Sequence, residues 1–490
     1  MTKMTKPANT NEYGRIVSFF QGVAKLEGPP HVFLHETLVD KKGNPAALVI
    51  GFDEHFVEAL FFDESFKPEE HVFRSREVFS LPITENIIGR TFNGLGRPID
   101  KLGPARGKRT PAFREAPQII DREPVTVPLS TGIKIIDTIL SLGRGQRELI
   151  IGDRKLGKST LALDTVLNQK NAEPPLICVY VLCGQKRQKL NEVLSLFEKN
   201  NAFLYTVVVA ATARSSFGEL YLAPFVGCAI GEYFRDQGKD ALVVYDDLSQ
   251  HAKAYRDIAL LLGRAPGREA YPGDIFSLHA KLLERAAKLS QKEGGGSLTA
   301  LPIIETQEGD ITAFIPTNFI SITDGQIYFE RGLFQKEFMP AVNVGLSVSR
   351  VGSHAQPPAL KEVTGGIRLA LAQHKELQKL AQLETTKSEE AKKNINRGEL
   401  LLELLKQEKN TNVAWEEQTV LFYVTEQGYF DDLEKNEWRR FEELFLELLR
   451  NRYFETLTSL KKEGFTNEVG KKIEGIVHDF KKEFGKIRMN

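Results

Sequence analysis

The sequence has few cysteines, no net charge and no long apolar segment. Its three cysteines, Cys178, Cys183 and Cys228, lie in apolar runs without metal-ligand spacing, so we expect reduced core residues. Lys+Arg and Asp+Glu both number 65, which gives no electrostatic case for nucleic acid or an anionic membrane surface. No run approaches the roughly 18 apolar residues of a membrane span, and no apolar signal segment follows Met1. Any membrane association is therefore expected to come through partners.

The 490 residues are long enough for about three domains, each with its own core. Short apolar stretches separated by turn residues indicate an antiparallel β-barrel, alternating strand and helix patterns indicate a parallel α/β domain, and Leu, Ala, Lys and Glu periodicity indicates helices. The sequence thus predicts a multidomain chain with a disordered leader (1–12), an N-terminal antiparallel β-barrel (13–82), a central α/β domain (83–365) and a C-terminal α-helical bundle (366–490).

A phosphate-binding motif follows the apolar run at 148–151. It reads Gly152, Asp153, Arg154, Lys155, Leu156, Gly157, Lys158, Ser159, and the residues from 160 to 169 are predicted to be helical. Gly152 and Gly157 allow the backbone to turn its N–H groups toward a polyphosphate, at the positive end of the helix. Lys158 would reach the β- and γ-phosphates, and the Ser159 hydroxyl would be a ligand of Mg²⁺. A chance glycine-rich turn is the alternative, and the strand–loop–helix setting disfavours it.

A second strand pattern, 241–245, ends in Asp246 and Asp247. A carboxylate at the end of such a strand can hold the Mg²⁺ shell, and we assign that role to Asp246. The alternative is an acidic pair that faces solvent.

Gln185 lies downstream of the motif, where a hydrolytic relative is expected to carry glutamate. Hydrolysis of a phosphoanhydride needs a base that orients and deprotonates water, and a neutral amide cannot accept that proton. The residue predicts a site that holds ATP without cleaving it. In the alternative, Gln185 is an ordinary surface amide and another carboxylate is the base.

Several strings extend these motifs along the chain. They occupy 143–154, 184–187, 231–236, 245–249, 266–274, 282–289, 294–307, 316–327 and 343–353. With them the chain resembles the alpha subunits of the F-type rotary ATP synthases, from about residue 80 to 360 and more weakly to the C-terminus.

The resemblance implies that residues 83–365 form a RecA-like P-loop nucleotide-binding domain and that the chain has a place in a six-membered ring. Such a subunit alternates with a homologous catalytic beta subunit around a central gamma shaft, with a delta subunit or peripheral stalk as a further partner. It binds ATP or ADP with Mg²⁺ without turnover, while the assembly makes ATP from a transmembrane proton gradient or hydrolyses it. The resemblance further implies the cytoplasmic face of the cell membrane, membrane association only through the ion-translocating sector, and no nucleic-acid partner.

The family's arginine finger falls on Arg350, beside Ser349, and both are expected to act in the neighbouring beta site. A guanidinium is planar and permanently charged, so it can neutralise the charge that gathers on a transferring phosphoryl group. The alternative is an interface arginine paired with a carboxylate.

The chain departs from the family pattern at a few positions. Lys155 stands where the phosphate loop usually has glutamine, Met339 replaces an arginine before Pro340, and Lys409 replaces a glutamine. Gln407 and Phe334 are retained as expected contacts of the nucleotide base. We expect phosphate binding to be kept, with the departures falling on base and ribose recognition. The family's usual N-terminal helix is also expected to be missing, because the barrel pattern begins near residue 13.

Two other functions fit parts of the pattern. A catalytic ring ATPase, of beta or export type, would need a carboxylate in place of Gln185. An RNA-translocating hexameric ATPase would need a basic, aromatic-lined barrel, whereas Phe61, Phe62 and Phe66 lie among acidic residues.

Overall fold

The structure is a computed structural model that describes residues 12–382 and 389–488. The chain forms two compact units, and both are discontinuous in sequence. The first unit comprises Met1–Pro124, Arg144–Arg154 and Gln169–Asp324, and the second comprises Val125–Gly143, Lys155–Asn168 and Gly325–Asn490. The predicted leader lies almost wholly outside the described residues, and the predicted domain boundaries at 82 and 365 stay predictions.

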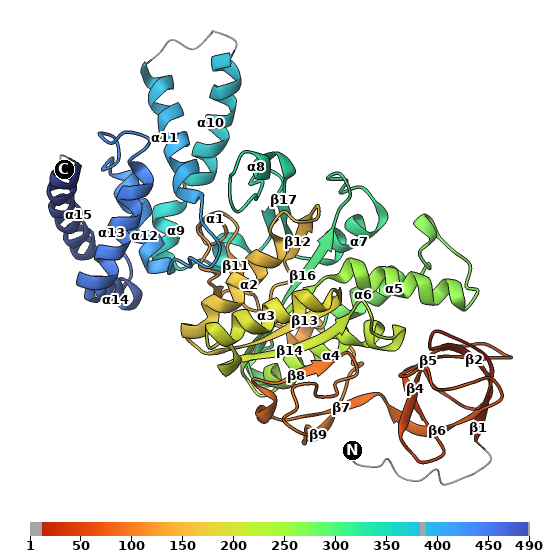
Figure 1. The fold of residues 1–490 in the computed structure, drawn as a ribbon. Helices are drawn as coiled ribbons and strands as arrows, with labels where there is room; N and C mark the ends of the chain where they lie inside the picture. The colour runs from red at the N-terminus through yellow and green to blue at the C-terminus, as the bar shows by residue number, and fades with distance from the viewer. Residues whose placement is uncertain (1–11, 383–388, 489–490) are drawn as a thin grey trace. The chain divides into compact units, whose positions relative to one another are not determined.

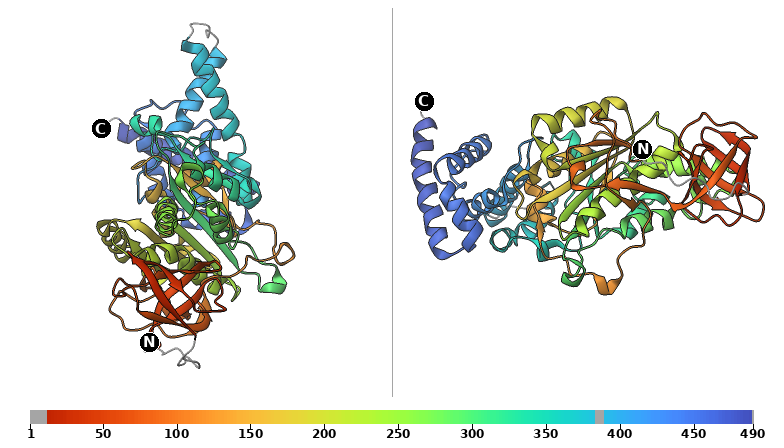
Figure 2. Two further views of the ribbon diagram at one scale, coloured as in Figure 1. Left: turned by 90° about the vertical axis from the view of Figure 1, so that its right-hand side faces the viewer. Right: turned by 90° about the horizontal axis from the view of Figure 1, so that it is seen from below.

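The first unit begins with the predicted antiparallel barrel, which is confirmed (red in Figures 1 and 2). Its strands close in the order β1-β2-β5-β4-β3-β6. They are β1 (Tyr13–Phe20), β2 (Val23–Glu27), β3 (Glu36–Val39), β4 (Pro45–Phe52), β5 (Val57–Phe61) and β6 (His71–Val78). Alternate apolar side chains, among them Ile16, Leu38 and Phe61, fill the interior.

A parallel sheet forms the rest of the first unit, as the strand and helix alternation predicts. Its strands lie in the order β8-β14-β13-β15-β16-β12. They are β8 (Thr91–Asn93), β12 (Leu149–Gly152), β13 (Leu176–Gln185), β14 (Thr206–Thr212), β15 (Asp240–Asp246) and β16 (Ser297–Glu305), and a separate antiparallel pair joins β7 (Ser80–Ile83) to β9 (Lys108–Pro111). The central strands are almost continuously apolar because helices cover both faces.

The helices of this unit are α3 (Arg187–Lys199), α4 (Phe217–Arg235), α5 (Leu248–Leu261), α6 (Ile275–Leu283) and α7 (Phe314–Ile322), with 3₁₀ turns at Glu85–Ile87, Ile119–Asp121, Gln169–Asn171, Ala202–Leu204, Arg268–Ala270 and Gln291–Glu293. Successive residues of β13 show that α3 and α4 lie on opposite faces. The Tyr180 ring packs edge-on against Phe197 of α3, whereas Val181 approaches Gly227 of α4, where an added Cβ would lie 2.2 Å from Val181 Cγ2.

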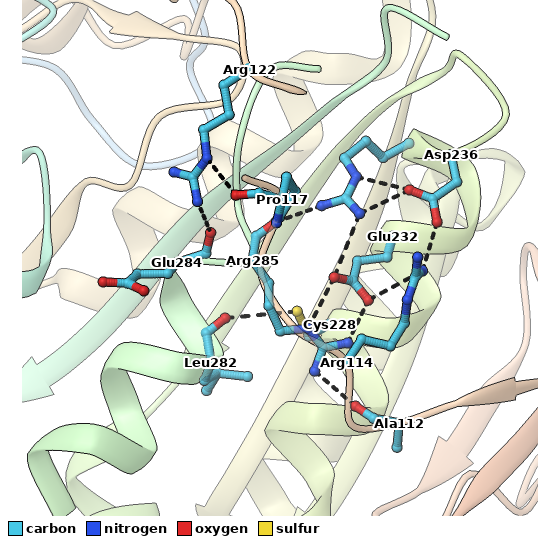
Figure 3. Close-up of polar contacts among 11 residues, drawn as sticks. Ala112, Arg114, Pro117, Arg122, Cys228, Glu232, Asp236, Leu282, Glu284 and Arg285 are labelled. Atoms are coloured by element: carbon cyan, nitrogen blue, oxygen red, sulfur yellow. Dashed lines mark hydrogen bonds and ion pairs between the residues drawn. The ribbon is translucent and has the colours of Figure 1, made fainter. Parts of the chain in front are cut away.

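A buried ionic cluster ties the end of α4 to two distant segments (Figure 3). Arg285 donates to both Glu232 carboxylate oxygens at 3.0 and 2.5 Å, and to the Ala112 carbonyl at 2.7 Å. Arg114 donates to Asp236 at 2.6 Å, and the Glu232 and Arg285 side chains are almost completely buried. Each buried charge is paired, as burial in a low dielectric requires.

The second unit is mainly helical, and its C-terminal part confirms the predicted helical domain. Its helices are α1 (Lys134–Ile139), α2 (Lys158–Asn168), α8 (Arg331–Gln335), α9 (Pro358–Thr364), α10 (Ile367–Gln382), α11 (Glu389–Leu405), α12 (Trp415–Glu426), α13 (Trp438–Arg452), α14 (Phe454–Glu463) and α15 (Asn467–Arg488), with a 3₁₀ turn at Gly352–Ala355. Its short strands are β10 (Pro128–Leu129), β11 (Leu142–Gly143), β17 (Gly325–Phe329) and β18 (Val348–Ser349). Helices α10 and α11 run side by side (Figures 1 and 2).

Asp137 of α1 holds several segments of the second unit together. Its buried carboxylate accepts hydrogen bonds from Ser130, Thr131 and Gly132 in the preceding loop and from Gln418 Nε2 in α12 at 3.0 Å. Burial raises the pKa of Asp137, and these donors act in the opposite direction. The loop before α1 is thereby fixed to the C-terminal helices.

Two expectations from composition concern the whole chain. Cys178, Cys183 and Cys228 are buried and unpaired with one another, as expected of reduced core residues. None of the helices in the described ranges combines the length and apolar character that crossing a membrane requires.

Candidate functional site

Three predicted site segments meet one edge of the parallel sheet. Strand β12 ends at Gly152, β13 ends at Gln185 and β15 ends at Asp246. Because neighbouring strands are parallel, their carboxyl ends lie on the same side, with Leu182 opposite Asp246 and Gly152 opposite Glu305. This is the edge at which open α/β sheets bind ligands.

The phosphate motif crosses from the first unit to the second between Arg154 and Lys155. In the first unit, buried Asp153 accepts hydrogen bonds from Thr306 Oγ1 at 2.7 Å and from the Gly309 backbone at 2.8 Å. Arg154 Nε donates to Glu305 Oε2 at 2.7 Å, although the arginine side chain is 66% exposed. Asp153 therefore fixes the loop, and Arg154 is held at its surface.

The second part of the motif leads into α2. Lys155 has a left-handed φ of 64° and is exposed, whereas Leu156 is buried. Gly157 has a φ of 105°, a conformation that residues with a Cβ rarely adopt. Helix α2 begins at Lys158, so Lys158 and Ser159 occupy its first turn, where free N–H groups and the helix dipole favour an anion.

Two buried carboxylates lie at the end of β15. Asp246 and Asp247 are 1% and 2% exposed, so the sequence alternative of a solvent-facing acidic pair is wrong. Tyr180, fully buried on β13, donates its hydroxyl to Asp246 Oδ2 at 2.8 Å. Asp247 is the N-cap of α5 and accepts from the Gln250 backbone at 2.8 Å. The two aspartates thus have different roles, since Asp246 accepts from the Tyr180 hydroxyl and Asp247 caps α5.

Gln185 lies against this acidic pair. Its Nε2 donates to Asp247 Oδ2 at 3.0 Å and is 3.4 Å from Asp246 Oδ1. The amide is therefore oriented as a donor, which is the reverse of what a proton-accepting base requires. Gln185 is a half-buried side chain with a specific polar partner, and it differs in this from an ordinary surface amide.

Arg350 follows β18 in the second unit and is exposed. Within the described ranges its guanidinium makes no hydrogen bond or ion pair. The segment before it is firmly held, because Arg368 donates to the Ser347 carbonyl at 3.0 Å and Ser347 Oγ accepts from the Tyr328 backbone at 2.9 Å. The backbone is fixed while the charged group stays accessible.

Ser349 contributes to that anchoring. Its hydroxyl donates to the Ser141 carbonyl at 2.9 Å and accepts from the Gly352 backbone at 3.0 Å. The single hydroxyl proton of Ser349 is thus engaged in holding the Arg350 turn. Its direct participation in catalysis stays a prediction.

Gln407, a predicted base contact in the second unit, is held by several hydrogen bonds. Its Nε2 donates to the Gly132 and Thr411 carbonyls, both at 2.7 Å, its Oε1 accepts from the Lys134 backbone at 2.8 Å, and its own backbone donates to Met339, the residue before Pro340. Only one lone pair of Oε1 is left for a ligand donor such as an adenine amino group. Phe334, in α8, is 38% exposed and presents an apolar surface.

Asp164 connects α2 to the loop that follows Gln407. Its carboxylate accepts from the Asn410 backbone at 3.2 Å, and its carbonyl accepts from Asn412 Nδ2 at 2.8 Å. Burial raises the pKa of Asp164 to about 6, while the Asn410 bond and the charge of Lys409 act in the opposite direction. Hydrogen bonds thereby join α2, which begins at Lys158, to the loop that follows Gln407.

Two of the aromatic residues considered for the RNA-translocating alternative, Phe61 and Phe62, are not available to stack bases. Phe61 and Phe62 are buried, and Phe66 packs on Phe61 with ring centroids 4.8 Å apart. Phe61 belongs to the barrel core, and Phe66 packs against that core. Their burial weakens the case for single-stranded nucleic acid at this barrel.

Sequence reasoning missed Tyr180 and the partnership of Gln185 with Asp247. The spacing of Asp247 and Gln250 before a helical pattern is a usable capping signal. No local signal marks Tyr180, because its contact with Asp246 depends on the register of β13 and β15.

The sheet edge and motif define a P-loop nucleotide-binding protein. Residues 132–349 match the family model described as the ATP synthase alpha/beta family, nucleotide-binding domain, and residues 356–480 match that of the ATP synthase alpha/beta chain, C terminal domain. The ATP synthase subunit alpha of Aquifex aeolicus (strain VF5) is 47% identical over 481 residues, which cover 97% of this chain and 95% of that relative. The chain belongs to the ATP synthase alpha/beta family, and the predicted resemblance to F-type alpha subunits is confirmed.

Proposed function

We propose that this chain holds ATP or ADP without hydrolysing it in the head of a rotary ATP synthase, and that it supplies Arg350 to an adjacent catalytic subunit. The observation that carries the proposal is the Gln185 amide, which donates to Asp247 at 3.0 Å. A donor therefore stands where a hydrolytic site needs a proton acceptor.

Mg²⁺ fits the oxygen donors at the site. A buried carboxylate, Asp246, and the Ser159 hydroxyl are the residues that would hold it, and hard cations prefer such ligands together with phosphate oxygens and water. When bound, the ion neutralises phosphate charge. The chain's own groups would then orient the nucleotide: Gly152 to Gly157 would offer backbone N–H groups, Lys158 would bind the phosphates, and Phe334, Pro340 and Gln407 are the proposed contacts of the base.

The exposed Arg350 supports a role across an interface. Its guanidinium is accessible while Ser347 and Ser349 fix the adjoining backbone. A homologous beta subunit would receive it, in an alternating ring around a gamma shaft with a delta subunit or peripheral stalk as a further partner. Membrane association would then arise only through the ion-translocating sector, at the cytoplasmic face of the cell membrane.

The test is to incubate the full chain with Mg-ATP, desalt it, identify the retained nucleotide and assay released phosphate. We expect retained, uncleaved ATP, and loss of retention in Lys158→Ala because the phosphate cation is removed. Steady phosphate release that disappears in Lys158→Ala would instead make the chain a catalytic ring ATPase. Absence of any retained nucleotide would also contradict the proposal.

A further inference from the structure

The amide of Gln185 and the carboxylate of Asp247 form a matched donor and acceptor. The Nε2 to Oδ2 distance is 3.0 Å, and Asp247 is 2% exposed. Asp247 cannot easily turn away, because its other oxygen accepts from the Gln250 backbone at 2.8 Å as the cap of α5. The carboxylate therefore presents a fixed acceptor to residue 185.

Two other polar side chains near this edge of the sheet already donate to carboxylates. The Tyr180 hydroxyl donates to Asp246 at 2.8 Å, and Arg154 donates to Glu305 at 2.7 Å. A glutamate at the half-buried position 185 would bring a third carboxylate beside Asp246 and Asp247, which are 1% and 2% exposed. Like charges so placed repel strongly, because solvent screening is weak there.

We propose that Asp247 is a second determinant of the non-hydrolytic site, because its fixed carboxylate selects an amide at 185 and disfavours a glutamate base. This inference rests on the proposed function and deepens it. The site is then kept from hydrolysis by a pair of residues, and restoring a glutamate alone does not restore a usable base.

Placing the carboxylate at 185 and the amide at 247 should relieve the repulsion between like charges. Asparagine at 247 can still cap α5 through its Oδ1, since asparagine and aspartate are comparable N-caps. Its amide can then donate to a glutamate at 185, so donor and acceptor trade places. Asp247→Asn alone should be tolerated, because Gln185 can rotate its amide to present the carbonyl oxygen.

The first experiment is a double-mutant cycle on the full chain without nucleotide, comparing wild type, Gln185→Glu, Asp247→Asn and both together. We expect Gln185→Glu to lower the Tm by roughly 4 °C or more, Asp247→Asn to have little effect, and the double variant to regain most of the loss. The matched control is Gln188→Glu, since Gln188 donates to Glu192 at 2.9 Å on the exposed face of α3. Solvent screens that pair, so its Tm should hardly change. Additive Tm shifts at 185 and 247 would overturn the proposal.

The second experiment measures single-turnover hydrolysis of ATP retained by the same full-length variants. A glutamate freed from repulsion should act as a general base, so the double variant should hydrolyse retained ATP at least roughly 10-fold faster than Gln185→Glu. Equal rates in those two variants, including no turnover in either, would overturn the proposal. Cleavage of retained ATP by the wild type would contradict the proposed function instead, while the Tm cycle would still report on the pair.

Discussion

At the scale of single residues, the proposed Mg²⁺ site depends on buried hydroxyl and carboxyl groups. Tyr180 is the clearest case, because its whole ring is buried and its one polar atom contacts Asp246. A hydroxyl that holds a metal-binding carboxylate in place acts on the metal through that carboxylate. Tyr180 is therefore a positioning residue for the proposed Mg²⁺ site.

Tyr180→Phe should weaken the Mg²⁺-dependent part of nucleotide affinity by about 10-fold, because Asp246 loses a charge-assisted hydrogen bond. Affinity in EDTA should be unchanged. Titration of a fluorescent ATP analogue with and without Mg²⁺ measures both. The control is Tyr245→Phe, another fully buried tyrosine on the neighbouring strand β15, whose hydroxyl lies near Cys228. An equal loss with and without Mg²⁺ would show that Tyr180 serves packing alone.

Asp164 predicts a pH dependence of stability. Its pKa of about 6 in the folded chain exceeds the roughly 3.9 of an unfolded aspartate. A raised pKa contributes stability that is fully present below about pH 4 and is lost as the pH rises through 6. Asp164→Asn should therefore gain stability relative to wild type between pH 4 and 7, by on the order of 2 kcal/mol, as measured by denaturant unfolding.

Asp310 provides the opposite control for that experiment. It is exposed, and its hydrogen bonds to Thr312 lower the pKa of Asp310. A lowered pKa contributes stability above the unfolded value that is lost as the pH falls, so Asp310→Asn should lose stability at neutral pH. The same pH trend in both variants would exclude our explanation for Asp164.

The candidate site could be predicted from sequence only where its residues follow a local pattern. Asp246 was found because it ends an apolar strand pattern, and the phosphate motif because its glycines and Lys158 have fixed spacing. The contact of Gln185 with Asp247 could not be predicted, since it depends on which residues of β13 and β15 lie opposite each other. Gln407 matched a family position, but two of its bonds to backbone groups, with Gly132 and Lys134, come from a segment remote in sequence.

At the scale of secondary-structure elements, close packing between helices and buried ion pairs hold the helices in place. The barrel, the parallel sheet and the C-terminal helices were predictable because their apolar periodicities differ. Strand β8 was not, because it has three residues and gains its place only by pairing with β14. The discontinuity of the two units also has no local signal in the sequence.

Helices α10 and α11 meet at Gly398. A Cβ added there would lie 2.3 Å from Cγ of His374, which is 2% exposed and so has little room to move. Gly398→Ala should destabilise the chain by about 1–3 kcal/mol through overpacking. Gly475→Ala, in α15 with nothing within 4 Å, should instead be neutral or stabilise by up to about 1 kcal/mol. Denaturant unfolding of both variants shows whether the contact between helices or the helix propensity of alanine determines the change in stability at position 398.

The ionic cluster at the end of α4 predicts a strong loss when one member is removed. Arg285→Met should destabilise by about 3–5 kcal/mol, because Glu232 keeps its buried charge and loses the guanidinium that pairs with both oxygens. Adding Glu232→Gln should recover part of that loss. Denaturant midpoints at constant m-value provide the measurement, and a double variant worse than Arg285→Met would contradict the pairing argument.

At the scale of the whole molecule, our proposal assigns nucleotide retention and charge neutralisation in the neighbouring catalytic site to different residues. Arg350→Ala, assembled with a catalytic beta subunit, should lower ATP hydrolysis by roughly 10³-fold or more while ATP retention by this chain is unchanged. The control is Arg439→Ala, an exposed arginine of α13 paired with Glu408 and Glu443. Equal hydrolysis by wild type and Arg350→Ala would exclude the finger role.

The interleaving of the two compact units has a consequence for biosynthesis. The chain passes between them after residues 124, 143, 154, 168 and 324, so a ribosome releases α1 and α2 long before the rest of their unit. At typical elongation rates, synthesis of residues 169–490 takes roughly 15–60 s. During that time Ile135 and Ile136 of α1, buried in the finished chain, are left without α9, α10 and α12, which contact α1. The nascent polypeptide is therefore expected to need a holding chaperone, and no single proteolytic cut can separate one unit from the other.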